Sequence, residues 1–322
     1  MSKMSSDPVR PALNGPTMGT RWSALSHVPP GLDPAPLRMA LQQGVDMADG
    51  RMSAWKPDSD LMRLNRAPAG QWVKVPPDFA RVLTLGLQIA RASAGAFDIG
   101  MGDAVRAWGL GPDAADPEAM RAALVRSRRP AHEVLEINGD AVRKTTPTAL
   151  DLNDRQGIWR GLPGQGAGAP RDCRWAGGHR RRDARPGPAV GSAWTIAVEA
   201  PDPDRRTPHS VPMLQDGAVA TSGDYRHGVT VQGRLSHTVD PRKSAPLAAP
   251  PASVTVVAPT CAPADAWATA LVAAGFSAGA ALAADHDLDP LFLLRDGKEG
   301  LQTRAVGRLF GSDATAAAGG RA

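Results

Sequence analysis

An aspartate and a threonine one helical turn apart carry the clearest chemistry in the sequence. Asp265 and Thr269 fall within PADAWATALVAAG (263–275), a segment whose composition predicts a helix. A spacing of four residues places the carboxylate and the hydroxyl on one face, near the helix N-terminus. Hard oxygen atoms beside the positive end of a helix dipole suit a Mg²⁺ ion that bridges to a phosphate group. Taken alone, the pair is better explained by a first-turn aspartate that supports the helix start and a threonine bonded to its own backbone.

The run HTVDPR (237–242) is a second candidate, because it follows a predicted strand and enters a loop. His237, Asp240 and Arg242 together could hold and protonate a phosphate ester. The alternative is a loop whose proline anchors a turn and whose aspartate and arginine form a surface ion pair.

Two small-residue segments could let a ligand approach the backbone closely. Thr221-Ser222-Gly223-Asp224-Tyr225 predicts a polar turn after a short apolar strand. Gly95-Ala96-Phe97-Asp98 predicts a tight turn after a helix, with an aromatic ring beside a carboxylate. Phe97 could contact a flat ring of a ligand or could belong to the core.

The elements that must position these residues follow from hydrophobic spacing and from proline and glycine signals. Helices are predicted from Asp33-Pro34 to about Met47, from Pro76-Pro77 to a stop at Gly95, and over 263–275. Strands are predicted over 17–26, 194–199, 229–235, 253–258 and 291–295. The mixed order of strands and helices predicts an α+β fold, with mixed sheets and packed helices, rather than a regular βαβ array.

Composition excludes several classes of protein. The chain has 322 residues, of which 42% are hydrophobic and 21% charged, as in an ordinary folded protein. No continuous apolar stretch reaches the roughly 20 residues of a membrane span, and two cysteines cannot form a disulfide framework. The first residues contain no apolar signal-peptide core, so the sequence as it stands predicts a cytoplasmic protein.

The whole of the net charge lies in one segment. Residues 154–190 contain eight arginines and three aspartates, without lysine or glutamate, which equals the net charge of +5 of the whole chain. This segment is rich in glycine and proline and shows no helix or strand period, so we expect it to form neither. One interpretation is a flexible basic arm that binds nucleic acid. The low aromatic content and the neutral remainder of the chain argue against it, and we expect no nucleic-acid partner.

The order of the motifs is more specific than any one of them. Met18-Gly19-Thr20 is followed in order by MSAWKPDSDLMRLN (52–65), GAFDIGMGDAVRAWGLG (95–111), LDLN (150–153), ATSGDYR (220–226), HTVDPR (237–242) and SVTVVAP…ADAWATAL (253–271). This series resembles the FAD:protein FMN transferases, the flavin transferase family also called thiamine-biosynthesis lipoproteins. The likeness extends over residues 16–153 and 191–300.

The resemblance implies an activity and a set of site residues. The implied reaction is Mg²⁺-dependent transfer of FMN from FAD to a threonine hydroxyl of a target flavoprotein, with release of AMP. The implied metal ligands are Asp265 and Thr269, and the implied base for the acceptor hydroxyl is either Asp265 or His237. The implied FAD-binding residues are Met18, Trp55, Ala96, Phe97, Asp98, Asn153 and Val239. Family members are often periplasmic or lipid-anchored, which the N-terminus here does not indicate.

Residues 154–190 depart from the family pattern. Family members continue after LDLN with a Gly-Ile-Ala-Lys-Gly-Tyr-like string, a helix and a Gly-Gly-Asp-like turn, whereas this chain reads DRQGIWRGLPGQG. Permitted codons for QGIWRGLPG can be chosen so that a one-nucleotide offset reads KGYGVDCL. Two compensating frameshifts, near residue 153 and between 187 and 192, would explain why the family pattern resumes at SAWTIAVEAP.

These observations define the expected domain organisation. We expect a disordered N-terminus over 1–15, one flavin transferase domain over 16–310 with an atypical segment at 154–190, and a disordered tail over 311–322. The alternative to an active transferase is an inactive or frameshift-damaged protein that retains the FAD and Mg²⁺ site. The target flavoprotein and the oligomeric state do not follow from the sequence.

Overall fold

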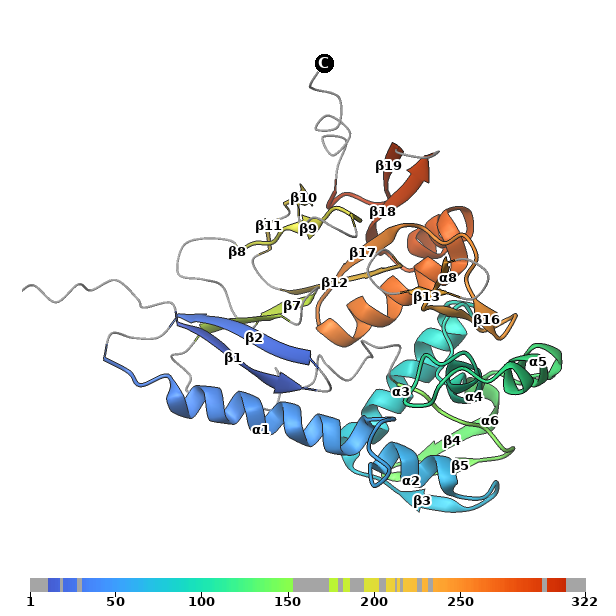
Figure 1. Cartoon of the computed structure of the whole chain (residues 1–322). Helices are drawn as coiled ribbons and strands as arrows, with labels where there is room; N and C mark the ends of the chain where they lie inside the picture. Colours follow the sequence, from blue (N-terminus) through green and yellow to red (C-terminus); the bar gives the residue numbers. More distant parts are fainter. Residues whose placement is uncertain are drawn as a thin grey trace, which may run out of the picture.

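An eight-stranded antiparallel sheet organises the protein (Figure 1). A computed structural model describes residues 11–17, 20–27, 31–152, 174–178, 182–185, 194–202, 207–211, 213–214, 217–224, 228–230, 234–296 and 300–310. In spatial order the strands are β1 (Ala12–Thr17), β2 (Thr20–His27), β6 (Arg174–Gly178), β7 (Arg182–Arg185), β12 (Gly217–Gly223), β17 (Ser253–Ala258), β18 (Asp289–Asp296) and β19 (Gly300–Ala305).

The chain enters this sheet through a hairpin rather than through the single strand predicted over 17–26. β1 and β2 pair in antiparallel register, with Ala12 opposite Leu25 and Thr17 opposite Thr20. Leu13 and Trp22 pack on Leu37 of α1 (Ala35–Met52), so the hairpin buries one face against that helix. β1 begins at Ala12, inside the segment 1–15 that was expected to be disordered. Its apolar residues alternate with exposed ones, which is enough to bury one face of a strand.

The expectation that residues 154–190 form no strand is wrong over two short stretches. β6 pairs with β2, β7 pairs with β12, and β6 and β7 pair with each other. Ladder hydrogen bonds come from the backbone, so neighbouring strands can recruit a segment that has no apolar alternation of its own.

Helix α8 (Cys261–Asp285) lies across the sheet and packs on β12 and β17. It is apolar on all sides because it is covered by the sheet and by α3 (Pro77–Ala92). Its length and composition would also suit a membrane span, but half of its most apolar window is buried within the protein, as expected for a core helix. The helix passes the end predicted at Gly275, where a left-handed φ of 73° kinks it before a second helical run.

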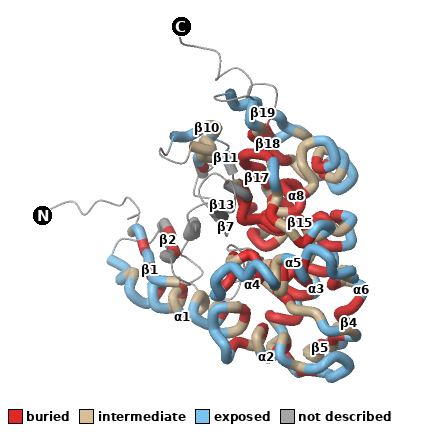
Figure 2. The backbone as a smooth tube through the Cα atoms, turned by 45° about the vertical axis from the view of Figure 1, so that its right-hand side comes forward, coloured by how far each residue is buried: buried red, intermediate tan, exposed pale blue. Residues whose placement is uncertain are grey.

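The principal core lies where α3, α8 and β17 meet (Figure 2). Phe79 and Leu83 of α3 and Phe292 of β18 are fully enclosed there. The predictions of a helix from Pro77 and of a strand over 253–258 are confirmed, because both segments have a clear apolar pattern.

Short elements complete the domain around this core. A three-stranded sheet has the order β3 (Trp72–Lys74), β5 (Ala141–Lys144), β4 (Leu135–Asn138). Four short helices are α2 (Asp60–Arg66), α4 (Gly102–Ala107), α5 (Pro117–Val125) and α6 (Ala131–Val134). Four strand pairs are β8 (Trp194–Thr195) with β11 (Met213–Leu214), β9 (Val198–Glu199) with β10 (Pro208–Ser210), β13 (Gly228–Thr230) with β14 (Arg234–Ser236), and β15 (Val239–Asp240) with β16 (Ala245–Pro246). The predicted strands 194–199 and 229–235 are therefore each divided in two.

Candidate active site

A cleft between the N-terminus of α8, the turn after α3 and strand β15 gathers most of the candidate residues. Its volume is about 600 Å³, open solvent at the mouth included. The residues that line it are Ala96, Phe97, Asp98, Met101, Val105, Asp151, Leu152, Val239, Pro241, Asp265, Ala266 and Thr269. The structure thus brings together six of the residues singled out in the sequence: Ala96, Phe97, Asp98, Val239, Asp265 and Thr269.

The helical pair lies on the floor of the cleft. Asp265 and Thr269 both line it, one turn of α8 apart, and only 3% of Asp265 is exposed. The Thr269 hydroxyl lies 3.0 Å from the Ser222 hydroxyl of β12. That contact crosses from the helix to the sheet and fixes the Thr269 rotamer, so the backbone-bonded alternative is not needed to satisfy this side chain.

Thr221, Ser222 and Gly223, predicted to open a polar turn over 221–225, are instead the end of a buried strand, and Tyr225 lies outside the described residues. β12 continues to Gly223 and pairs with β17, with Thr221 opposite Thr255. The hydroxyls of these two threonines lie 2.8 Å apart. Polar residues can lie in a central strand here because each hydroxyl has a partner across the ladder or on α8.

The turn after α3 forms the opposite wall of the cleft. Gly95 adopts a φ of 76°, as expected for the residue that ends a helix. The Phe97 backbone N–H donates to the Ser93 hydroxyl at 3.2 Å, which holds the turn closed. The Phe97 ring belongs to the principal core and also lines the cleft, so it fills both of the roles considered for it.

Asp98 anchors a neighbouring helix from the cleft wall. Its carboxylate accepts the backbone N–H of Gly100 at 2.8 Å and of Ala131, the first residue of α6, at 3.2 Å. Burial raises the pKa of Asp98 above its ordinary value, against the opposing effect of these two N–H donors and of nearby His132 and Arg128. The side chain therefore has a structural partner at each oxygen in addition to its place on the cleft.

Asp151 is a cleft residue that the sequence analysis did not single out. It belongs to LDLN, whose Asn153 lies outside the described residues, and its backbone N–H donates to the Ile99 carbonyl at 2.8 Å. The motif itself was the signal that could have identified it. Asp98, Asp151 and Asp265 are the three acidic residues of a lining that is otherwise mainly apolar.

The HTVDPR segment forms the rim of the cleft through Val239 and Pro241. His237 is 8% exposed and does not contribute to the described lining. Asp240 accepts both the backbone N–H and the Nε of Arg242, at 3.0 and 3.1 Å, so the turn with an internal ion pair is what forms here.

One predicted FAD-binding residue, Trp55, lies away from the described lining of the cleft. Trp55 is 52% exposed in the loop between α1 and α2 and is not part of the described lining. Met18 lies, like Asn153, outside the described residues. Trp108 is buried, and its indole N–H donates to the Ser244 carbonyl at 2.9 Å, as expected for a core residue.

Comparison with known sequences identifies relatives along most of the chain. The ApbE family profile matches residues 18–158 and 175–292. A protein from Klebsiella pneumoniae (strain 342) named "FAD:protein FMN transferase" is 30% identical over an alignment of 317 positions, which covers 90% of this chain and 86% of that protein.

Solved structures of similar shape come from the same group of proteins. A flavin transferase ApbE from Vibrio cholerae superposes with a TM-score of 0.78 at 27% identity, covering 93% of this chain and 97% of that one. The apo form of the flavinyl transferase ApbE from Pseudomonas stutzeri gives a TM-score of 0.79 at 27% identity, covering 96% and 97%. These structures share the α+β architecture of this chain.

Proposed function

Because the chain belongs to the ApbE family, we propose that its cleft binds FAD and transfers the FMN half to a hydroxyl of a target flavoprotein. The observation that supports this most directly is the convergence of Asp265 and Thr269 with the Ala96–Asp98 turn and Val239 on one cleft. These residues come from three separate motifs of the family resemblance, and all of them line one surface.

The residues of the cleft fit a Mg²⁺ ion. Asp265 and Thr269 supply a carboxylate and a hydroxyl, and Asp151 adds a second carboxylate to the same lining. The described residues hold no group of three or more His, Cys, Asp or Glu side chains that would form a complete cage. Mg²⁺ commonly takes only one or two protein carboxylates and completes its coordination with water and substrate phosphates. When bound, the ion would neutralise charge on the pyrophosphate of FAD.

The side chains themselves prepare this arrangement. Ser222 orients the Thr269 hydroxyl by a hydrogen bond that leaves a lone pair of the Thr269 oxygen for the ion. Asp265 is held in a fixed position by the helix and is shielded from bulk water. Phe97 and Met101 contribute apolar surface against which a flat ring can pack.

The proposed reaction is a phosphoryl-group transfer. The acceptor oxygen, proposed to be that of a threonine, bonds to the phosphorus of the FMN half, the bond from that phosphorus to the bridging oxygen breaks, and AMP leaves with the electron pair. The proton of the acceptor hydroxyl passes to a base. Asp265, on the cleft, and His237, two residues from the cleft rim, are the candidates for that base.

A metal-binding and transfer experiment on the full chain tests this function. Wild-type protein is expected to bind Mg²⁺ in the presence of FAD by calorimetry and to transfer a fluorescent flavin to a threonine-bearing acceptor. Asp265→Ala should abolish both properties while leaving the helix intact, because alanine is a good helix former. Thr269→Ala should weaken Mg²⁺ affinity less, since a neutral hydroxyl contributes less than a carboxylate. Unchanged Mg²⁺ affinity in Asp265→Ala would refute the metal assignment.

His237 is tested by a separate variant. His237→Gln removes a base and keeps a polar side chain of similar size, so we expect FAD affinity to be retained and transfer to slow. A pH profile of transfer that is the same in His237→Gln and in wild-type protein would assign the base to another group.

A further inference from the structure

A polar groove lies next to the cleft proposed to bind FAD, which we call the flavin cleft. This groove has no role in the function proposed above. It consists of two contiguous hollows of about 870 and 550 Å³, open solvent included, which share Arg126, Ser127 and Arg128. Its basic side chains are Arg126, Arg128, Arg129, Arg242 and Lys243. We call this surface the basic groove. It adjoins the flavin cleft directly, because Asp98 and Pro241 line both.

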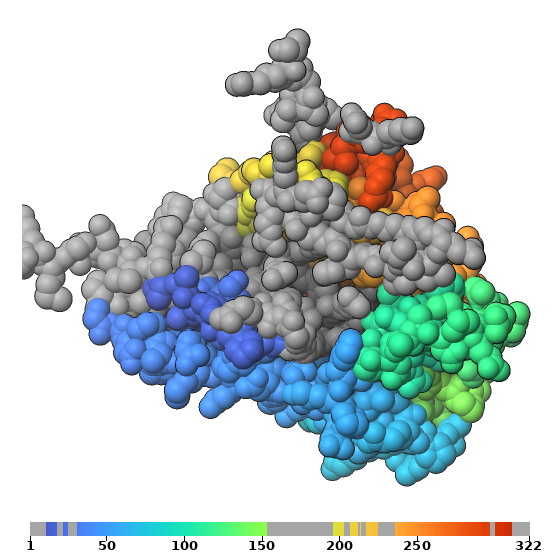
Figure 3. All heavy atoms as spheres, in the orientation of Figure 1, coloured from blue at the N-terminus to red at the C-terminus, as the bar shows by residue number. Residues whose placement is uncertain are grey.

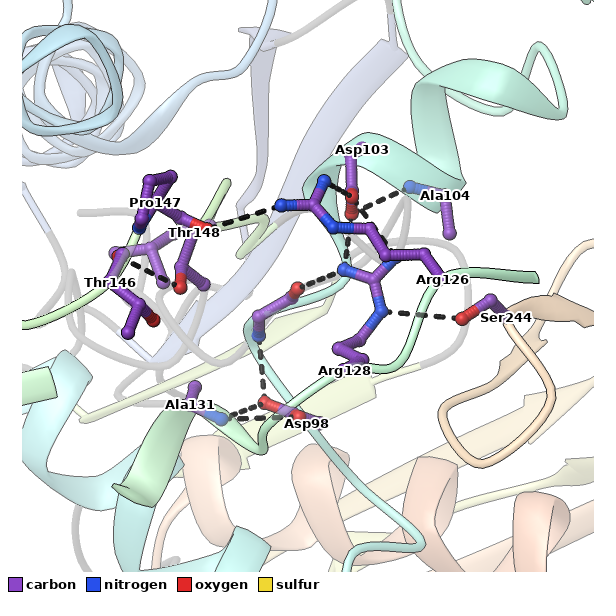
Figure 4. Close-up of polar contacts among 12 residues, drawn as sticks. Asp98, Asp103, Ala104, Arg126, Arg128, Ala131, Thr146, Pro147, Thr148 and Ser244 are labelled. Carbon is purple, nitrogen blue, oxygen red and sulfur yellow. Dashed lines mark hydrogen bonds and ion pairs between the residues drawn. The ribbon is translucent and has the colours of Figure 1, made fainter. Parts of the chain in front are cut away.

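Hydrogen bonds fix the centre of the groove (Figure 4). The Arg128 guanidinium donates to both oxygens of Asp103, to the Gly100 carbonyl at 3.1 Å and to the Ser244 hydroxyl at 3.2 Å. Its side chain is 11% exposed. Arg128 therefore ties α4 to the loop that follows β15 and gives the groove a rigid floor.

The groove carries more positive charge than its acidic neighbours neutralise. Asp103 is shared by Arg126 and Arg128, so one carboxylate faces two guanidinium groups. Arg129 pairs with Glu133 and Arg242 pairs with Asp240. Lys243 is exposed, and none of the described carboxylates forms an ion pair with it. Arg126 lines the groove and is half exposed, and besides the pair with Asp103 its guanidinium donates to the Pro147 carbonyl at 3.5 Å.

An exposed apolar side chain, Leu124, lies among the residues that line the groove. Leu124 and its neighbour Val125 end helix α5 and are 50% and 84% exposed. Figure 3 shows the residues of α4 and α5, in green, as a lobe at the right-hand side of the molecule. Exposed aliphatic side chains beside a cluster of cations suit a ligand that carries both carboxylates and an apolar side chain.

We propose that the basic groove docks an acidic segment of the acceptor protein, next to the residue that receives FMN. This inference rests on the proposed function, since a transferase must hold its protein substrate at the mouth of the flavin cleft. The shared residues Asp98 and Pro241 let an extended chain pass from the groove to the cleft. Carboxylates of the segment would meet Arg126 and Lys243, and an apolar side chain would rest on Leu124.

The direct test is peptide binding to the full chain in the presence of FAD and Mg²⁺. The probe is a fluorescein-labelled peptide with a central threonine flanked by glutamates and a leucine, and its reference replaces each glutamate by glutamine. Fluorescence anisotropy should show tighter binding of the glutamate peptide. The difference should shrink as salt rises from about 50 to about 300 mM, because salt screens exposed charges.

Charge reversal locates the binding site. The double variant Arg126→Glu/Lys243→Glu should bind the glutamate peptide at least about tenfold more weakly than wild-type protein, which corresponds to about 1.4 kcal/mol. The matched control reverses two exposed arginines outside the groove, Arg81→Glu/Arg121→Glu, and should change affinity by less than about twofold. Arg128 is left unchanged because its hydrogen bonds support the fold.

Two further measurements keep the outcomes separate. Lys243→Gln tests the groove with a substitution at an exposed side chain, and a several-fold loss of peptide affinity is expected even if the double variant folds poorly. Flavin fluorescence titration should give the same FAD affinity in all variants. Equal peptide affinity in groove and control variants would overturn the docking site, as would a loss of FAD affinity confined to the groove variants. Failure of wild-type protein to bind FAD would instead count against the proposed function.

Discussion

The side-chain amide of Asn65 holds the backbone of Leu150 through both of its polar atoms. The Asn65 Nδ2 donates to the Leu150 carbonyl and the Leu150 N–H donates to the Asn65 Oδ1, each at 2.8 Å. The backbone carbonyl of Asn65 in turn accepts a hydrogen bond from the buried ammonium of Lys144 at 2.8 Å. The Asn65 side chain thereby pairs with the Leu150 backbone as a neighbouring strand would. Because Asp151 follows Leu150 directly, this pairing also positions Asp151 at the cleft.

Asn65→Ala is expected to destabilise the protein and to loosen the flavin site. Two backbone groups of Leu150 lose their partner, which should lower the free energy of unfolding by about 2 kcal/mol. FAD affinity should fall as well, because Asp151 and Leu152 lose their anchor. Urea denaturation and flavin fluorescence titration measure the two effects. Asn138→Ala, at an exposed asparagine of β4, is the control and should change neither. A stable Asn65→Ala protein with normal FAD affinity would show that the clamp is dispensable.

Two tryptophan variants separate packing from ligand binding. Trp108 is buried and donates to the Ser244 carbonyl, so Trp108→Ala should lower the free energy of unfolding by about 3–5 kcal/mol. Trp55 is half exposed and has no packing role of that size. If Trp55 stacks on a ring of FAD, Trp55→Ala should weaken FAD binding by about 1–3 kcal/mol.

Thermal melts on both tryptophan variants test the packing role of Trp108, and FAD titrations on both test the binding role of Trp55. Trp55→Phe retains an aromatic ring and should restore most of the FAD affinity. Equal FAD affinity in wild-type and Trp55→Ala protein would remove Trp55 from the binding site.

The buried carboxyl of Asp98 should make stability depend on pH. Burial raises the pKa of Asp98 in the folded protein above its ordinary value of 3.8, so between the two pKa values the folded state holds more protons than the unfolded state. The contribution of Asp98 to stability is therefore greatest at acid pH and declines as pH rises from about 4 through the raised pKa.

Asp98→Asn removes this titration and keeps an oxygen that can accept the Gly100 N–H. The free energy of unfolding of the variant, relative to wild type, should rise with pH across that window, as measured by urea denaturation at several pH values. A difference between the two proteins that stays constant over the whole range would contradict the raised pKa.

The gene sequence tests the interpretation of residues 154–190. The family match omits residues 159–174, within this segment. We predict that the DNA carries an offset reading frame over the segment that encodes a KGYGVD-like string, and that a chain with this frame restored transfers FMN faster than the chain as written. The comparison uses the same transfer assay on both chains. An offset frame without such a string would mean that the basic segment is a genuine part of this protein.

The sequence alone determined the local features of the site. Asp265 and Thr269 share a helix face because the α-helix repeats every 3.6 residues, and this follows from their spacing of four. The helix from Pro77 and the strand Ser253–Ala258 were also predictable, because each buries a regular apolar pattern. The order of short motifs was enough to identify the family.

Only the tertiary structure decided which distant residues meet. Asn65 and Leu150 are 85 positions apart, and Ser222 and Thr269 are 47 apart. No local period predicts such contacts, which depend on how α8 packs on the sheet and how the 150–152 segment crosses α2. The strands within the arginine-rich segment were also not predictable from local sequence, because the backbones of neighbouring strands, rather than their own side chains, supply the hydrogen bonds that form them. The basic groove likewise joins arginines near residue 128 to Lys243, because Arg128 reaches across to Ser244.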